Sequence, residues 1–192
     1  MRIPHNPVFY DFEASQALDG FPIEVGWAFV ANDGDLLISD SRLIQPVAEW
    51  NIDTRWEDDA QTLHGIDKAM LLAEGYHPYQ VTRHMNAALQ ESVLFSDSPI
   101  DEKWLNDLYD VAGLSPSFEV RRTSCDTLIR SCAQANAIGA VELDRLILLA
   151  RTLAPQIHRA QADALHWAWI WRAIQKPHLI DAKPFSVRIS LE

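Results

Sequence analysis

Three apolar runs of strand length open the chain, and they constrain the fold more than any other feature. Residues 8–13 have the composition of a buried strand, and two further runs follow at 22–30 and 35–44. An Asn-Asp-Gly segment at residues 32–34 separates the last two runs. Because an Asp-Gly step between apolar runs is a strong hairpin signal, we expect these two strands to pair antiparallel.

The rest of the chain favours helices with two more short strands. Spaced apolar residues after Trp56 indicate helices, which Gly65 and Gly75 are expected to break into short pieces. Pro78 is well placed to open the next helix. We expect short strands at residues 92–96 and 117–122, and helices at 101–114, 127–137, 141–154 and 162–175. This order predicts an α/β fold with one mixed sheet covered by helices.

The size and composition of the chain are those of one globular domain. Its 192 residues, 48% of them hydrophobic, suffice for one well-buried core. We expect residues 1–175 to form this domain and residues 176–192 to form a C-terminal tail that packs as an extra strand or stays partly mobile. No apolar stretch approaches the roughly 20 residues that cross a bilayer, and no apolar signal core precedes the first strand. We therefore expect a cytoplasmic protein without a membrane partner.

The net charge of −11 limits the nucleic acids that such a protein could hold. Proteins that grip long duplexes carry a basic face, because neutralising phosphates and releasing counterions supplies most of the affinity. The positive charges here are few, the densest being Arg121 and Arg122. Extended coverage of nucleic acid is therefore not expected. Contact with a few nucleotides at a strand end, where bound cations supply the positive charge, is compatible with this balance.

Two carboxylates end the first apolar run. Asp11 and Glu13 lie two apart on an expected strand, so both side chains point to one face while Phe12 points to the other. They could mark a strand end that emerges into solvent. The apolar residues 8–10 before them and Phe12 between them instead favour a position at the edge of a core. Clustered carboxylate oxygens are ligands that Mg²⁺ and Mn²⁺ prefer.

Asp101 is the next candidate ligand, because it opens a helix directly after a short strand. Taken alone, it is better explained as an acid that stabilises the start of a helix. Asp97, four residues earlier, is a competitor for the ligand role or a helix cap.

His158 and Asp163 form the last candidate pair. On one regular helix, residues five apart would lie about 140° from each other and could not serve one site. Pro155 allows a different arrangement, with His158 on a loop or frayed first turn and Asp163 inside the helix. That arrangement suits a base that approaches an attacking water while the carboxylate holds a cation.

Three segments together resemble the motifs of the DEDDh branch of 3′–5′ exonucleases, which belong to the ribonuclease H-like group. They are DFEAS at 11–15, IDEKWL at 100–105 and HRAQADA at 158–164. The resemblance implies a ribonuclease H-like sheet with helices on both faces and two Mg²⁺ or Mn²⁺ ions. It also implies a metal site of Asp11, Glu13, Asp101 and Asp163, with His158 as general base.

The same resemblance suggests where a substrate would lie. The LHGI segment at residues 63–66 looks like the family segment near the terminal nucleotide, although His64 could equally cap a helix. The family's Thr-rich segment after the first Glu is replaced here by residues 14–16, and the second motif also departs from the usual pattern. Substrate contacts are expected from Phe12, Ala14, Ser15, His64 and Ile66.

The sequence therefore predicts a metal-dependent 3′–5′ exonuclease that releases nucleoside 5′-monophosphates from short single-stranded RNA or DNA. Its partners would be nucleic-acid 3′ ends. A hydrolase of small nucleotide phosphodiesters and a non-catalytic ribonuclease H-like binding module are the alternatives. Relatives suggest a homodimer, and Trp169 is a candidate contact for a partner subunit. Core packing is expected instead for the neighbouring Trp167, Ile170, Trp171 and Ile174, which share one helical face.

Overall fold

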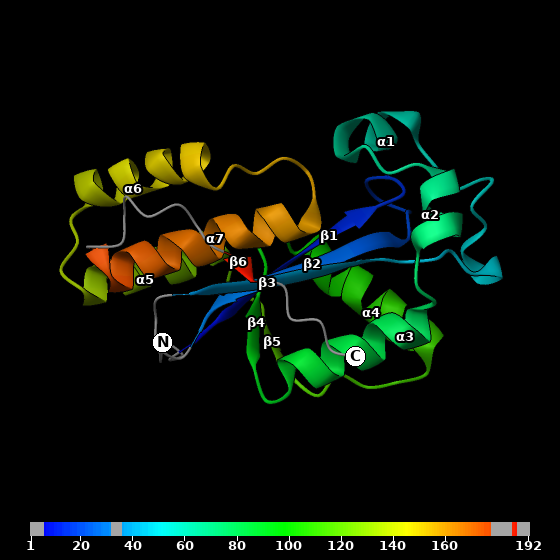
Figure 1. The fold of residues 1–192 in the computed structure, drawn as a ribbon, viewed down its shortest axis with the longest axis horizontal. Helices are drawn as coiled ribbons and strands as arrows, with labels where there is room; N and C mark the ends of the chain where they lie inside the picture. Colours follow the sequence, from blue (N-terminus) through cyan, green and yellow to red (C-terminus); the bar gives the residue numbers. More distant parts are fainter. Residues whose placement is uncertain (1–5, 32–35, 178–185, 188–192) are drawn as a thin grey trace.

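The computed structural model describes residues 6–31, 36–177 and 186–187, and it has one mixed sheet between two groups of helices (Figure 1). Six strands lie in the order β5-β4-β1-β2-β3-β6. Their bounds are β1 Val8–Ala14, β2 Pro22–Val30, β3 Leu37–Leu43, β4 Val93–Phe95, β5 Glu119–Arg121 and β6 Ser186–Val187. The expected α/β class is confirmed.

The sheet is antiparallel on one side of β1 and parallel on the other. β2 pairs antiparallel with β3, as the apolar runs predicted, and β1 also pairs antiparallel with β2. The Asn-Asp-Gly segment that signalled this hairpin lies outside the described residues. β4 runs parallel to β1, and β5 parallel to β4. In the C-terminal tail, β6 pairs parallel with β3, so the tail contributes an extra strand.

Helix ends follow the signals in the sequence. Gly65 ends the first helix with φ 69°, a left-handed conformation that favours glycine. Asp67 caps the start of the second helix, where its side chain accepts a 2.7 Å hydrogen bond from the Met70 N–H. Pro78 stands at the first position of its helix, and Ser124 caps another. The helices are α1 Asp58–His64, α2 Lys68–Glu74, α3 Pro78–Leu89, α4 Ile100–Ala112, α5 Cys125–Ala135, α6 Ala140–Leu153 and α7 Ala160–Gln175, with a 3₁₀ turn at Ala48–Trp50.

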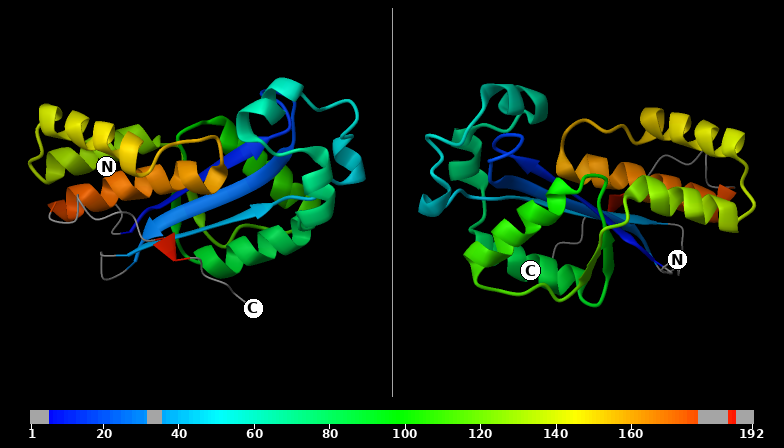
Figure 2. Two further views of the ribbon diagram at one scale, coloured as in Figure 1. Left: turned by 45° about the horizontal axis from the view of Figure 1, so that its top comes forward. Right: turned by 180° about the vertical axis from the view of Figure 1, so that it is seen from behind.

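The alternation of side chains along β1 divides the interior into two apolar clusters. Phe9 packs on one face with residues of α5, α6 and α7. Tyr10 and Phe12 pack on the opposite face with residues of α3 and α4. Figure 2 shows α5, α6 and α7 grouped on one side of the sheet, with α3 and α4 on the other. Helices therefore cover both faces.

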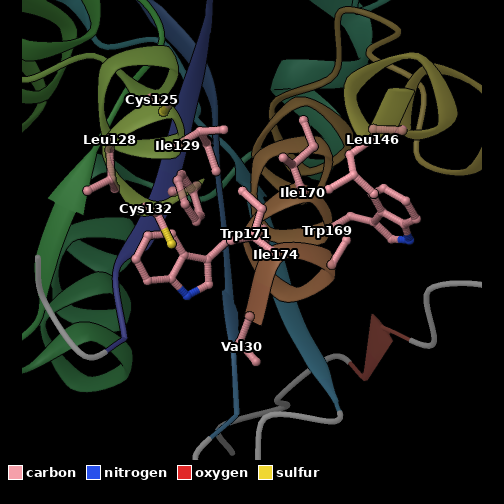
Figure 3. Packing of buried hydrophobic residues seen from close by; sticks show 14 of the residues in the cluster. Val30, Cys125, Leu128, Ile129, Cys132, Leu146, Trp169, Ile170, Trp171 and Ile174 are labelled. Carbon is pink, nitrogen blue, oxygen red and sulfur yellow. The ribbon is translucent and has the colours of Figure 1, made fainter. Parts of the chain in front are cut away.

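The position of Trp169 corrects the sequence prediction. Its side chain is fully buried, so it is not available to a partner subunit. In Figure 3 Trp171 points from α7 toward Cys132 on α5, whereas Trp169 points toward Leu146 on α6. The prediction assumed that α7 buries one face. Because α7 lies between the sheet and two outer helices, almost its whole circumference is apolar and covered.

Cys125 and Cys132 are free, buried thiols on α5. Across the described residues, no helix has both the length and the apolar character that spanning a membrane requires.

Replacing Trp169 by alanine is expected to lower the free energy of unfolding by about 3–5 kcal/mol, because it leaves a large cavity between α6 and α7. Urea denaturation measures this loss. Leu148→Ala is the control, since Leu148 lies on α6 with 66% of its surface exposed and should cost far less. Equal effects of the two substitutions would contradict the packing described here.

Candidate functional site

The end of β1 and the start of α7 bring three ionisable side chains together. One ligand atom from each of Glu13, His158 and Asp163 lies within 4.8 Å of the other two. Glu13 and Asp163 are buried, whereas His158 is exposed. Residues that are far apart in the sequence thus share one cluster at the C-terminal end of β1, a central strand of the sheet.

The register of β1 and β2 explains why Asp11 and Glu13 face α7. Asp11 lies opposite Gly26 and Glu13 opposite Glu24, so all four positions lie on one face of the sheet. A Cβ on Gly26 would come within 2.2 Å of the backbone nitrogen of Gln161 in α7. The helix backbone therefore lies directly on β2 beside the two carboxylates.

Asp101 approaches the same region from the other side of the sheet. It lies in the first turn of α4 with 2% of its surface exposed. Its carboxylate accepts a short hydrogen bond from the Ser96 hydroxyl. Burial raises the pKa of Asp101 to about 7, although hydrogen bonds from Ser96 and from the backbone of Ser98 and Phe12 oppose that rise. The contact with Phe12 fixes Asp101 next to β1.

His158 lies outside regular structure, in the segment that joins α6 to α7. Its φ of 55° is left-handed, and α7 begins only at Ala160. Asp163 lies in the first turn of α7 and accepts a 2.9 Å hydrogen bond from the backbone N–H of Ile157. The expected arrangement, with the histidine on a loop and the carboxylate in the helix, is therefore present.

Burial, with mutual repulsion added to it, governs the electrostatics of the two carboxyls on β1. Burial raises the pKa of Asp11 well above its usual value, and the charges of Asp101, Glu13 and Asp163 raise it further. Burial, followed by the charges of Asp163 and Glu24, raises the pKa of Glu13 to about 8. A group of buried carboxyls with raised pKa values is stabilised either by bound protons or by a bound cation.

A divalent metal fits this donor set. The converging carboxylates are hard oxygen ligands, which suit Mg²⁺ and Mn²⁺, and a cation would relieve the repulsion that adds to the effect of burial on the pKa of Asp11 and Glu13. Glu13 and Asp163 have ligand atoms close enough together to share an ion, and a ring nitrogen of His158 lies within 4.8 Å of both. Asp11 and Asp101 flank this group, within electrostatic reach of each other.

Three of the predicted substrate contacts have covered side chains. Phe12 and Ile66 pack in the apolar cluster under α3 and α4, with 6% and 0% of their surfaces exposed. The Ser15 hydroxyl is buried and accepts from the Phe21 N–H at 3.0 Å, which closes the loop between β1 and β2. The contacts predicted for these residues stay predictions, as does that for the half-buried Ala14.

His64 is also buried, and its tautomer is fixed by a neighbour. Its Nδ1 accepts a 3.0 Å hydrogen bond from the backbone N–H of Ile66. A neutral ring must then carry its proton on Nε2, which faces the backbone of Ala14. Burial lowers the pKa of His64, which favours the neutral ring, although the contact with the Ala14 backbone opposes that shift.

Sequence reasoning missed three polar residues that hold the cluster in place. Ser96 binds Asp101, and the ion pair of Glu24 with Arg159 binds the start of α7 to β2. Glu24 carried a readable signal, because a carboxylate in the middle of an apolar strand has to find a partner. Ser96 and Arg159 gave no signal beyond their proximity to Asp101 and His158 in the sequence.

A hollow of about 460 Å³ adjoins Asp101 through Ser96. Its charged lining residues are the exposed Asp97, the competitor for the ligand role, with Glu102, Arg121 and Arg122, and Arg122 pairs with Glu102 at 3.2 Å. Tyr10, Pro99 and Val120 contribute apolar surface, and Ser124 and Thr127 contribute hydroxyls from the start of α5. The hollow therefore combines an apolar wall with a rim of two arginines and two carboxylates.

Comparison with known proteins identifies the fold. No protein-family model matches the sequence, and no curated protein sequence matches it either. Among solved structures, the zinc-bound form of E. coli exonuclease I with single-stranded DNA has a TM-score of 0.63 at 14% identity. A structure of exonuclease I that concerns its processivity gives 0.64 at 13%, and the complex with a dA16 oligonucleotide gives 0.63 at 14%.

Each of these matches covers 92% of this chain but only 42% of exonuclease I. This chain therefore spans less than half the length of the proteins it resembles. The shared architecture is the ribonuclease H-like α/β fold, with a mixed sheet and helices on both faces.

Without metal, the melting temperature is expected to fall as pH rises from about 5 to about 8. The pKa of Glu13 is about 8 in the folded protein, against 4.5 ordinarily, so between these values the folded state binds more protons than the unfolded state and loses stability as pH increases. Mn²⁺ should restore more stability near pH 8 than near pH 5. Thermal melts with and without Mn²⁺ measure both effects.

Glu13→Gln is the control for this experiment, because it removes the carboxyl while keeping its approximate shape. The variant should lose part of the fall in melting temperature with pH. A wild-type melting temperature that Mn²⁺ leaves unchanged at both pH values would contradict a cation site here.

Proposed function

We propose that this protein is a metal-dependent 3′–5′ exonuclease that releases nucleoside 5′-monophosphates from short single-stranded nucleic acid. The observation that carries the proposal is the meeting of Glu13, Asp163 and His158, with Asp11 and Asp101 close by, on a ribonuclease H-like sheet. The fold shared with exonuclease I, which binds single-stranded DNA, supports the same class of substrate. Residues 1–175 would form the catalytic domain.

Each side chain of the cluster has a role in this proposal. Asp11, Glu13, Asp101 and Asp163 would hold two Mg²⁺ or Mn²⁺ ions. Such ions neutralise charge on the phosphodiester and on the oxygens that enter and leave it. His158, exposed at the edge of the cluster, would accept a proton from the attacking water as a general base.

The hollow beside Asp101 supports a short substrate. The nucleotide on the 5′ side of the scissile bond would lie against Tyr10 and Val120, with a phosphate near Arg122. With a net charge of −11, the surface offers little to hold a long strand by its phosphates. A product assay with dinucleotides, longer oligomers and cyclic nucleotides distinguishes this exonuclease from a hydrolase of small phosphodiesters.

The His158→Ala variant is expected to lose cleavage by about 10²- to 10⁴-fold while still binding Mn²⁺, because a general base contributes to the rate and not to holding the cation. Asp11→Asn should lose both cleavage and Mn²⁺ affinity. Single-turnover cleavage of a labelled oligonucleotide and Mn²⁺ titration measure the two properties. Asp110→Asn, an exposed carboxyl near the end of α4, is the control. An Asp11→Asn variant that cleaves as fast as the wild type would contradict the assignment of Asp11 as a metal ligand.

The Arg122→Ala variant is expected to raise the KM for short oligonucleotides while leaving kcat unchanged. Loss of one phosphate contact on a single strand should reduce the slope of log affinity against log salt by about 0.7. Measuring KM at several salt concentrations tests this expectation. Arg130→Ala is the matched control, since Arg130 lies on α5, pairs with Asp126 at 2.8 Å and is not among the residues that line the hollow. Identical salt slopes for the two variants would exclude Arg122 from the substrate site.

A further inference from the structure

His158 has a backbone conformation that its surroundings must maintain. Its φ of 55° lies in the left-handed region, which residues with a Cβ seldom occupy. The residue is exposed and lies between two helices, so neither a helix ladder nor core packing holds it. Conformations of this kind persist when neighbouring contacts determine them.

Contacts on both sides of His158 provide this restraint. On its N-terminal side, the Ile157 N–H is bound by Asp163. On its C-terminal side, Arg159 donates from Nε and Nη2 to Glu24 at 3.0 and 2.8 Å. The Ala160 N–H donates to the same carboxylate at 3.0 Å. The two residues that follow His158 are thus held by one side chain of β2.

Glu24 is a rigid point of attachment. It is 1% exposed and lies on β2 directly opposite Glu13, the residue that shares the cluster with His158. Two residues further along β2, Gly26 admits the backbone of α7, and a side chain there would collide with it. The start of α7 therefore has one fixed position relative to the strand pair that carries Asp11 and Glu13.

The hydrogen bonds that Glu24 accepts also distinguish its role from that of Glu13, a proposed metal ligand. Both of its carboxylate oxygens are engaged by Arg159, and one of them also by Ala160. A bidentate guanidinium pair fixes both distance and orientation, which a single point charge does not. Glu24 is therefore occupied in anchoring and lies outside the proposed ligand set.

We propose that the Glu24–Arg159 ion pair is a positioning device that holds His158 over the Glu13 and Asp163 carboxylates. This inference rests on the proposed nuclease function for its effect on rate. Arg159 and Glu24 are positioning residues, because they act through the backbone that flanks His158. Their loss should displace the imidazole without removing a ligand of the cation.

The test compares Arg159→Ala, Arg159→Lys and Glu24→Gln with the wild type. Arg159→Ala is expected to lower kcat on a labelled oligonucleotide by roughly 10- to 100-fold, the loss that a misplaced catalytic group causes. KM and Mn²⁺ affinity should stay unchanged. Arg159→Lys should recover part of the rate, because it keeps the charge while losing the second hydrogen bond. Arg145→Ala, which removes an exposed arginine on α6, is the control.

Glu24→Gln provides a second route if Arg159→Ala folds poorly, because glutamine keeps an acceptor for the Ala160 N–H. It should also lower kcat without changing Mn²⁺ affinity. A raised KM at unchanged kcat in the Arg159 variants would mean that Arg159 contacts substrate, and it would overturn the proposal. A fall in kcat with a parallel loss of Mn²⁺ affinity would overturn it as well.

A readout that does not need activity separates this inference from the proposed function. The intraresidue NOE between the HN and Hα protons of His158 reports its φ, because a positive φ brings these two protons close together. In the wild type this NOE should be strong, and in Arg159→Ala it should weaken as the residue samples negative φ. If the wild type cleaves nothing, the nuclease proposal fails, and this NOE still decides the positioning role. An unchanged NOE in Arg159→Ala would overturn it.

Discussion

The close approach of α7 to β2 is the constraint on which the site depends. Gly26 has no side chain, so the backbone at the start of α7 rests on the strand, and Glu24 binds that start through Arg159 and Ala160. This contact brings Asp163 and the residues before it beside β1. Without it, the carboxylates of β1 and α7 would have no common position. The buried indoles further along α7 keep the same helix in register with the sheet.

The second constraint is electrostatic. The fold confines carboxyls from β1, α4 and α7 to one partly buried region. Burial raises the pKa of Asp11, Glu13 and Asp101, and repulsion between the carboxyls raises the pKa of Asp11 and Glu13 further. Hydrogen bonds from Ser96 and from the Ile157 backbone hold Asp101 and Asp163 in place despite this repulsion. Carboxylates that repel one another in the free protein are suited to binding a cation. The site therefore has an electrostatic cost in the folded state that binding would offset.

Much of the fold could be predicted from local patterns. The apolar runs marked β1, β2 and β3, and the glycine and proline positions marked the ends of α1, α2 and α3, because these signals act within a few residues. Trp169 was misjudged for the opposite reason. A helical period identifies one buried face, but α7 is covered by the sheet and by two helices, so residues off that face are buried as well. The number of layers around a helix is not a property of its own sequence.

The sequence by itself determined the kinds of ligand available and the local geometry that pairs Asp11 with Glu13, since alternation along a strand is a local property. The family resemblance singled out Glu13, and the tertiary structure gives the physical difference between Glu13 and Glu24. Both are buried carboxylates that lie opposite each other on one face of the sheet. Arg159, 135 residues from Glu24 in the sequence, engages both oxygens of Glu24 and leaves Glu13 beside His158 and Asp163. Long-range packing decides which carboxylate keeps its oxygens free, because strand periodicity treats the two alike.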